Sequence, residues 1–120
     1  MISSLQVIDA STVLAGPSVG MFFAELGATV IKVEHPTHPD VTRSWKLASE
    51  NRASRVSAYF SSINFGKKYI ALDLKNQNDH TQFRDLLANA DILITNFKKG
   101  DDQKFNLTDS DLRTINPRLI

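Results

Sequence analysis

The segment TVLAGPSVGMFFAELGATVIKVE, residues 12–34, is the most informative part of the sequence about the fold class. It is typical of a loop, a helix and a β-strand that ends on an acidic residue. Pro17 suits the first helical position, because its missing N–H would be unpaired there in any residue. Gly27 tolerates a left-handed backbone and marks the helix end. ATVIKVE, residues 28–34, is rich in the β-branched residues that favour strands.

The glycines of this segment exclude the usual NAD-binding loop. Gly16, Gly20 and Gly27 cannot form the G-x-G-x-x-G spacing. A helix N-terminus with unpaired N–H groups still favours phosphate, and Gly16 lets a ligand approach the backbone. The alternative is that Gly16 only permits a tight turn. Residues 19–26 are apolar nearly all round, so we expect other elements to cover most sides of this helix.

Strands and helices alternate along the rest of the chain. We expect strands at residues 5–9, 28–34, 69–74 and 91–95, and helices at residues 17–26, 56–63, 76–90 and from an N-cap at Thr108 to Pro117. Asp111 has the capping-box spacing from Thr108, and residues 35–55 are polar enough for a long loop. This order predicts one α/β domain over residues 1–120. Its fold is Rossmann-like, with a mostly parallel sheet of about four strands and helices on both faces.

Composition restricts the function further. The net charge of +1 calls for neither nucleic acid nor an anionic membrane, and the absence of cysteine excludes disulfides and thiolate metal sites. His35 and His38 lack further metal ligands nearby, so we expect no metal. The start, MISSLQVIDA, has no signal-peptide pattern, and no apolar run approaches the roughly 18 residues of a membrane span. We expect a cytoplasmic protein.

Ligands of parallel sheets bind beyond the carboxyl ends of the strands. The candidate rim therefore comprises residues 9–17, 34–38, 73–75 and 96–104. Asn96 and Phe97 offer an amide and a flat ring, which suit a nucleobase or a pantetheine arm, or else anchor the loop. Glu34 stands where NAD enzymes place a ribose-binding acid. Lysines around the third and fourth strands offer phosphate partners or form an ordinary solvated surface; they are Lys67, Lys68, Lys75, Lys98, Lys99 and Lys104.

Four segments, in order, resemble the N-terminal part of the class III coenzyme A transferases, a family that includes formyl-CoA and carnitine CoA-transferases and α-methylacyl-CoA racemase. They are VIDASTVLAGPSVGMFFAELGATVIKVEHP, YFSSINFGKKYIALDLKNQ, ADILITNFKKG and LRTINPRLI. Together they cover nearly the whole chain. The stretch TRSWKLASENRASRVSAYF is more similar to the transferases than to the racemase, which is shorter there.

The resemblance implies that the rim binds coenzyme A or acyl-CoA. Position by position, it implicates Val13, Leu14, Ala15, His35, Leu72, Lys75, Asn96, Phe97, Lys104 and Phe105. Some positions depart from the family pattern. Leu14 replaces a Gln of some transferases, and His35 replaces an Arg, so that a permanent charge becomes titratable. Lys99 replaces a Pro, and Lys104 replaces an Arg and gives up bidentate phosphate pairing.

The implied function is transfer of CoA between carboxylic acids. The family's catalytic Asp lies beyond NPRLI, so no catalytic residue is assigned here, and we expect weak CoA binding and no activity without a C-terminal portion supplied in trans. The family's interlocked dimers imply a homodimer. Two alternatives remain open: a non-catalytic dimeric interaction module that pairs through the edge strand at residues 91–95, and a degenerate NAD-binding domain.

Overall fold

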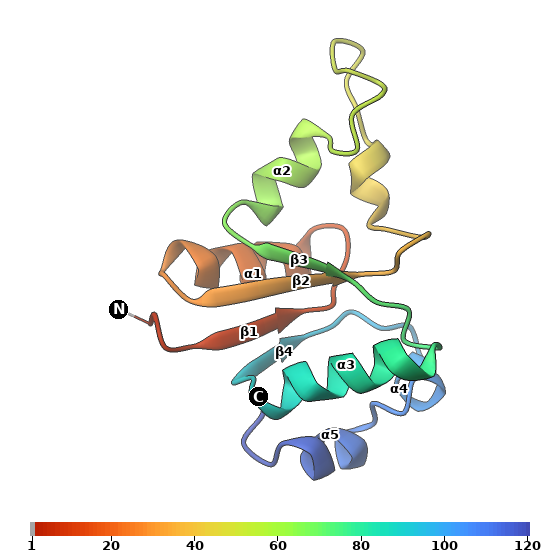
Figure 1. The fold of residues 1–120 in the computed structure, drawn as a ribbon. Coiled ribbons are helices and arrows are strands. Elements are labelled where there is room, and N and C mark those ends of the chain that lie inside the picture. The colour runs from red at the N-terminus through yellow and green to blue at the C-terminus, as the bar shows by residue number, and fades with distance from the viewer. Residues whose placement is uncertain (1) are drawn as a thin grey trace.

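The computed structural model describes residues 2–120 (Figure 1). Its elements in chain order are β1 (Gln6–Asp9), α1 (Ala15–Glu25), β2 (Thr29–Glu34), the 3₁₀ helix η1 (Val41–Ser44), α2 (Ala58–Asn64), β3 (Lys68–Ala71), α3 (Gln77–Ala88), β4 (Ile92–Ile94), α4 (Asp101–Lys104) and α5 (Asp109–Ile115). Within residues 2–120, no helix is both long and apolar enough to cross a membrane.

The four strands form one parallel sheet in the order β3-β2-β1-β4. Val7 of β1 pairs with Val30 of β2 on one side and with Ile92 of β4 on the other. Because every neighbouring pair is parallel, all four carboxyl ends lie along the same edge of the sheet. The predicted Rossmann-like architecture, with about four parallel strands, is confirmed.

Helices cover both faces of the sheet (Figure 1). Strand side chains alternate between the faces, so Val7 and Val30 pack on the α1 side with Phe23, whereas Ile8 and Val33 point to the other side. There they join a larger core cluster that includes buried residues of α3. The sequence of α3 accounts for this packing, since its apolar stripe places its fully buried side chains on one face.

Several helix ends match the predictions. Gly27 has a φ of 98°, so it ends α1 in the left-handed region as expected. The capping box at α5 is present: the Thr108 hydroxyl accepts the N–H of Asp111, and the Asp111 carboxylate accepts the N–H of Thr108. Asn76 caps α3 by accepting the N–H groups of Asn78 and Asp79.

Other predicted boundaries of helices and strands differ from those of the structure. Helix α1 begins at Ala15, so Pro17 lies in the first turn rather than at the first position. Strand β3 ends at Ala71, because the chain turns toward α3 over the following residues. The polar loop contains η1, which forms because the Asp40 carboxylate accepts the N–H of Thr42. Helix α4 was missed because it has only four residues and no apolar stripe.

Helix α1 is less covered than its sequence predicts. Val19 is 47% exposed and Phe22 is 55% exposed, while Gly20 on the opposite side is buried. The expectation that other elements cover most sides of this helix is therefore wrong for the described residues. One face packs on the sheet and on α2, and the outer face is exposed to solvent.

A buried ion pair joins α1, β1 and the start of β3. The Nζ atom of Lys67 lies 2.7 Å from Oδ2 of Asp9, and both side chains are almost completely buried. Lys67 also donates to the Pro17 carbonyl and to Oδ1 of Asn64, so all three ammonium hydrogens have acceptors. Burial lowers the pKa of Lys67, although the Asp9 carboxylate opposes this effect.

Gly20 leaves room for this ion pair beneath α1. A Cβ atom at this position would lie 2.8 Å from Oδ2 of Asp9 and 3.2 Å from Nζ of Lys67. Gly20 therefore lets the helix backbone approach the pair.

We expect Lys67→Met to destabilise the fold by about 3–5 kcal/mol, because it leaves the Asp9 carboxylate buried without a cation. The measurement is the free energy of unfolding from urea denaturation at neutral pH. Lys68→Met is the control, because Lys68 is exposed at the start of β3, and its effect should stay within about 0.5 kcal/mol. Equal losses for the two variants would contradict the role assigned to the buried pair.

Candidate functional site

The carboxyl-end rim is held together by side chains that bind the backbone of neighbouring loops. Asn96, after β4, joins Thr12, after β1, by two hydrogen bonds: its Oδ1 accepts the Thr12 N–H at 3.1 Å, and its Nδ2 donates to the Thr12 carbonyl at 2.8 Å. The Asn96 amide is thus engaged as a loop anchor, one of the two roles predicted for it. The structure therefore brings the first and fourth rim loops together.

A second link joins the loops after β2 and β3. Nε2 of His35 lies 3.5 Å from Oδ1 of Asp73. Nδ1 of His35 accepts the N–H groups of Thr37 and His38, each at 3.1 Å. Because Nδ1 acts as the acceptor of these bonds, Nε2 is the ring nitrogen that faces Asp73. Among residues 2–120, no group of three or more His, Asp or Glu side chains is arranged to hold a metal ion.

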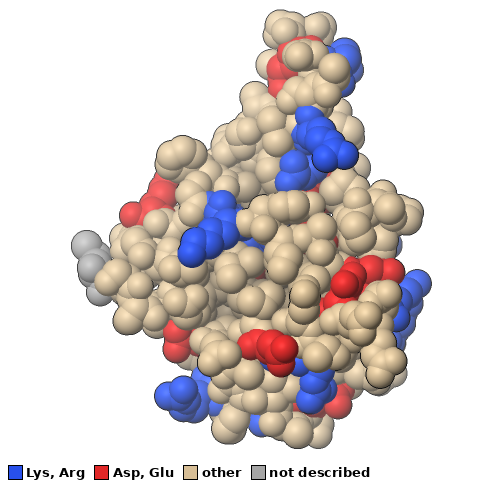
Figure 2. Space-filling view, viewed as in Figure 1, with Lys and Arg blue, Asp and Glu red and all other residues tan. Residues whose placement is uncertain are grey.

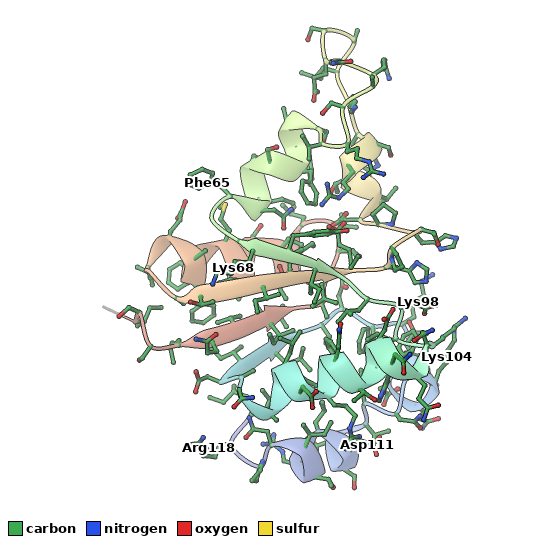
Figure 3. The ribbon with its side chains drawn as sticks, viewed as in Figure 1. Phe65, Lys68, Lys98, Lys104, Asp111 and Arg118 are labelled. Carbon is green, nitrogen blue, oxygen red and sulfur yellow. The ribbon has the colours of Figure 1, made fainter. Side chains whose placement is uncertain are left out.

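Aromatic rings and lysines gather on one part of the rim. The rings of Phe97 and Phe105 lie 5.6 Å apart, and the ammonium of Lys104 lies 5.5 Å from the Phe105 ring. Lys75 and Lys104 line the same hollow, of about 430 Å³, which also includes His80. Figure 3 shows Lys98 and Lys104 on the carboxyl-end side of the sheet, whereas Lys68 lies toward the opposite end.

The other candidate residues differ in what they can offer a ligand. Leu14 is 49% exposed and Ala15 is exposed, and no side chain caps α1 at Leu14. The backbone N–H groups at the start of this helix are therefore not engaged by a side-chain cap at Leu14. Leu72 is 3% exposed and belongs to the core below the rim. Only the Leu72 backbone could reach a ligand.

Two of the predicted lysines do not serve the rim. Lys67 is buried in its ion pair with Asp9, and Lys68 lies at the amino end of β3. Lys67 directly precedes β3 and Lys68 is its first residue, so both belong to the amino end of this strand, opposite the rim. Lys98 and Lys99 do lie at the rim, where they line a hollow of about 320 Å³ that includes Asn96 and Phe97.

Sequence reasoning missed a second buried ion pair under the rim. Lys32 of β2 is 2% exposed, and its Nζ donates to Oδ2 of Asp40 at 3.1 Å and to the Ser11 carbonyl at 2.6 Å. The Asp40 carboxylate also accepts the Thr42 N–H, the Thr42 hydroxyl and the Val13 N–H. The sequence feature that indicates this pair is the lysine in the middle of the apolar strand TVIKVE, because a buried lysine requires a partner.

Glu34 is engaged by the protein itself. Nη2 of Arg43 donates to Oε2 of Glu34 at 2.6 Å, and the N–H of Asp40 donates to Oε1 at 2.7 Å. The guanidinium of Arg43 also lies 3.8 Å from the centroid of the Phe60 ring. The hydrogen bond to Glu34 raises the pKa of Arg43 above its usual value. Because Glu34 is buried and paired, the reading of it as a ribose-binding acid is wrong.

The segment between η1 and α2, residues 45–57, projects from the rest of the fold at the top of Figure 1. A further hollow, of about 670 Å³, lies beside this projection and is lined by basic side chains, among them Arg43, Lys46, Arg52 and Arg55. Figure 2 shows Lys and Arg side chains along this projection. Arg43 is paired with Glu34, and Lys46 donates to three backbone carbonyls. None of the ten predicted ligand residues lines this hollow.

The Asp40 network predicts an acid-sensitive fold. Burial alone would raise the pKa of Asp40, but hydrogen bonds from Thr42 and the charge of Lys32 outweigh it, so this pKa lies below the ordinary 3.8. A carboxyl group with a lowered pKa stabilises the fold above its unfolded-state pKa, and this contribution is lost as the pH falls through the folded-state pKa.

We therefore expect Asp40→Asn to destabilise the fold at neutral pH by about 3–5 kcal/mol, because Lys32 stays buried without its anion. As the pH falls below about 4 and through the lowered pKa of folded Asp40, the difference between wild type and variant should shrink, since the wild type then loses the Asp40 charge as well. Urea denaturation across this pH range measures both effects. Asp85→Asn, at an exposed position of α3, is the control; a difference from wild type that does not change with pH would contradict the assignment.

Known proteins match both the sequence and the fold. A model of CoA-transferase family III matches residues 2–120. Succinate–glutarate CoA-transferase of Agrobacterium fabrum is 39% identical over 99% of this chain, and succinyl-CoA:mesaconate CoA-transferase of Haloarcula hispanica is 37% identical over 99%. The chain spans 30% of the length of each of these two relatives.

Solved structures agree with the sequence match. A CAIB/BAIF family protein from Brucella suis is 40% identical over 97% of this chain, with a TM-score of 0.85. A hypothetical protein from Mycobacterium tuberculosis is 32% identical over 100% of the chain, with a TM-score of 0.84. The chain covers 31% and 32% of those two chains. Because the family model matches nearly the whole sequence, the chain belongs to CoA-transferase family III.

Proposed function

We propose that residues 1–120 form the N-terminal, CoA-binding-type α/β domain of a CoA-transferase, incomplete relative to the family. The observation that supports this most directly is the rim. Lys75 and Lys104 line one hollow, the ammonium of Lys104 lies 5.5 Å from the Phe105 ring, and that ring lies 5.6 Å from the Phe97 ring. Cations and an apolar ring pair suit the phosphates and the adenine of coenzyme A.

Each part of the rim has a role in this proposal. Lys75 and Lys104 attract phosphate groups as flexible point charges, with less geometric specificity than arginine would give. The uncapped first turn of α1 offers N–H groups to a phosphate or to the pantetheine arm. Asn96 acts indirectly, because its amide holds Thr12 and thereby fixes the loop that precedes α1.

The proposed reaction is transfer of CoA between carboxylic acids, with dicarboxylic acids as the substrate class. The printed names of the relatives support this class, since they include succinate, glutarate and mesaconate. Such a transfer requires a nucleophile that attacks the acyl-CoA thioester. In residues 2–120, the buried carboxylates Asp9, Glu34 and Asp40 are each ion-paired, so none of them is free to attack. We place the catalytic carboxylate in a C-terminal portion outside this chain.

We expect the chain to bind CoA with a Kd on the order of millimolar, measured by isothermal titration calorimetry. Lys75→Met and Lys104→Met should each weaken binding by about tenfold, because each removes one charge-assisted contact. The control is Lys68→Met, at the opposite end of the sheet. Repeating the titrations with dephospho-CoA identifies the lysine that meets the 3′-phosphate. Absence of binding heat at millimolar CoA would contradict the proposal.

A C-terminal portion supplied in trans, taken from a relative, should restore transfer of CoA between succinate and glutarate. Lys104→Met should raise the KM for the acyl-CoA in that mixture. Transfer activity of the chain by itself would contradict the placement of the nucleophile.

The proposal includes a homodimer. The exposed outer face of α1, with Val19 and Phe22, is an apolar surface that association would cover. The outer edge of β4 is engaged at its start, where Ile120 accepts the N–H of Leu93 and donates to the Asp91 carbonyl. We therefore favour the α1 face over the strand edge. Sedimentation velocity of Phe22→Ser tests this choice: a mass equal to the wild-type dimer would contradict it.

A further inference from the structure

Val13 has an unusual backbone conformation in the rim loop. Its φ is 73°, in the left-handed region that β-branched residues rarely adopt. A strained conformation at such a residue persists only where surrounding contacts hold it, and such residues cluster at ligand-binding sites. The neighbouring residue Thr12 is held by Asn96. The backbone of Val13 itself must be held from another direction.

The Asp40 carboxylate supplies that contact. The Val13 N–H lies 3.1 Å from Oδ2 and 3.3 Å from Oδ1 of Asp40, across 27 positions of the chain. Asp40 is itself immobilised, because Oδ2 also accepts from Lys32 and Oδ1 accepts from the N–H and hydroxyl of Thr42. Asp40 is 2% exposed, so water does not compete for these bonds.

We infer that Asp40 is a positioning residue for the ligand loop: its carboxylate holds Val13 in the left-handed conformation, which sets how Leu14 and Ala15 present the first turn of α1. This inference rests on the proposed CoA-binding function. The turn has no side-chain cap of its own, so its geometry depends on contacts from outside the helix. Lys32 acts indirectly, because its ammonium group keeps the Asp40 carboxylate in place.

The chemistry of an amide shows why the carboxylate matters. Four donors converge on the two oxygens of Asp40. In Asp40→Asn, one oxygen becomes an NH₂ donor. Thr42 supplies two of the four donors, so the remaining oxygen is expected to stay with Thr42. The NH₂ group then faces the Val13 N–H and Lys32, and the contact that holds Val13 is lost.

The first test needs no ligand. A left-handed residue shows a strong intraresidue NOE between its N–H and Hα, because the two atoms are close in that conformation. We expect wild type to show this NOE at Val13 and Asp40→Asn to lose it. The matched control is Thr42→Val, which removes one hydrogen bond to Asp40 but leaves the Val13 contact, and it should keep the NOE. Retention of the NOE in Asp40→Asn would overturn the inference.

The second test uses CoA affinity and glycine rescue. Glycine adopts positive φ without strain, so Val13→Gly should make the loop less dependent on Asp40. We expect Asp40→Asn to weaken CoA binding by about tenfold in the wild-type background. In the Val13→Gly background, we expect a change of less than about threefold. Equal losses in the two backgrounds would show that Asp40 supports the fold in general, and would overturn the inference.

The NOE and the CoA affinity test the role of Asp40 and the proposed function separately. A wild-type chain without CoA affinity would contradict the proposed function, while the NOE at Val13 would still decide the role of Asp40. Where Asp40→Asn is too unstable for NMR, the double variant with Val13→Gly is expected to unfold at a higher urea midpoint than Asp40→Asn alone. An unchanged midpoint would overturn the inference.

Discussion

Charged side chains are buried between the sheet, α1 and the loops of the rim, and the arrangement of those loops depends on how their charges are satisfied. Asp9 pairs with Lys67, and Lys32 pairs with Asp40. Removing such groups from water is unfavourable unless every donor and acceptor finds a partner. Within residues 2–120, no buried side-chain nitrogen or oxygen lacks a hydrogen-bond partner. The network therefore allows little freedom in where the backbone runs.

This constraint explains why the loops converge. Lys32 lies in the middle of β2, yet it donates to the Ser11 carbonyl of the first loop and to Asp40 of the second. Asn96 then joins the fourth loop to Thr12. Dinucleotide-binding proteins have a glycine-rich turn after the first strand. In this protein, the loop at that place is instead held by side chains of other loops and strands that bind its backbone. The loop can thus carry Val13 at a position where glycine would be the unstrained choice.

The rim combines rigid and exposed parts. Its buried side fixes the backbone, whereas Lys75, Lys98 and Lys104 occupy exposed positions. Lys104 lies near the Phe105 ring, and Lys98 lines the same hollow as Phe97. A surface of this kind suits a long flexible carrier, because flexible cations adapt to phosphates while the fixed backbone sets the position of the arm. The buried carboxylates beneath this surface, Asp9, Glu34 and Asp40, are each ion-paired.

Sequence patterns were sufficient to predict the alternation of strands and helices, the parallel sheet, the end of α1 at Gly27 and the capping box of α5. These features depend on local patterns, such as β-branched runs, apolar stripes and cap residues, which act within a few positions of the chain. The sequence also indicated which loops form the rim, because parallel strands place their carboxyl ends on one edge.

The roles of the charged residues, by contrast, depend on how distant segments pack together. Lys67 and Lys68 are neighbours in the chain, yet the first is buried against Asp9 and the second is exposed. Glu34 binds Arg43 rather than a ribose, and Asp40 binds backbone 27 positions away. A charge is stabilised by whichever partner lies within a few ångströms, and that partner is set by the packing of the whole fold.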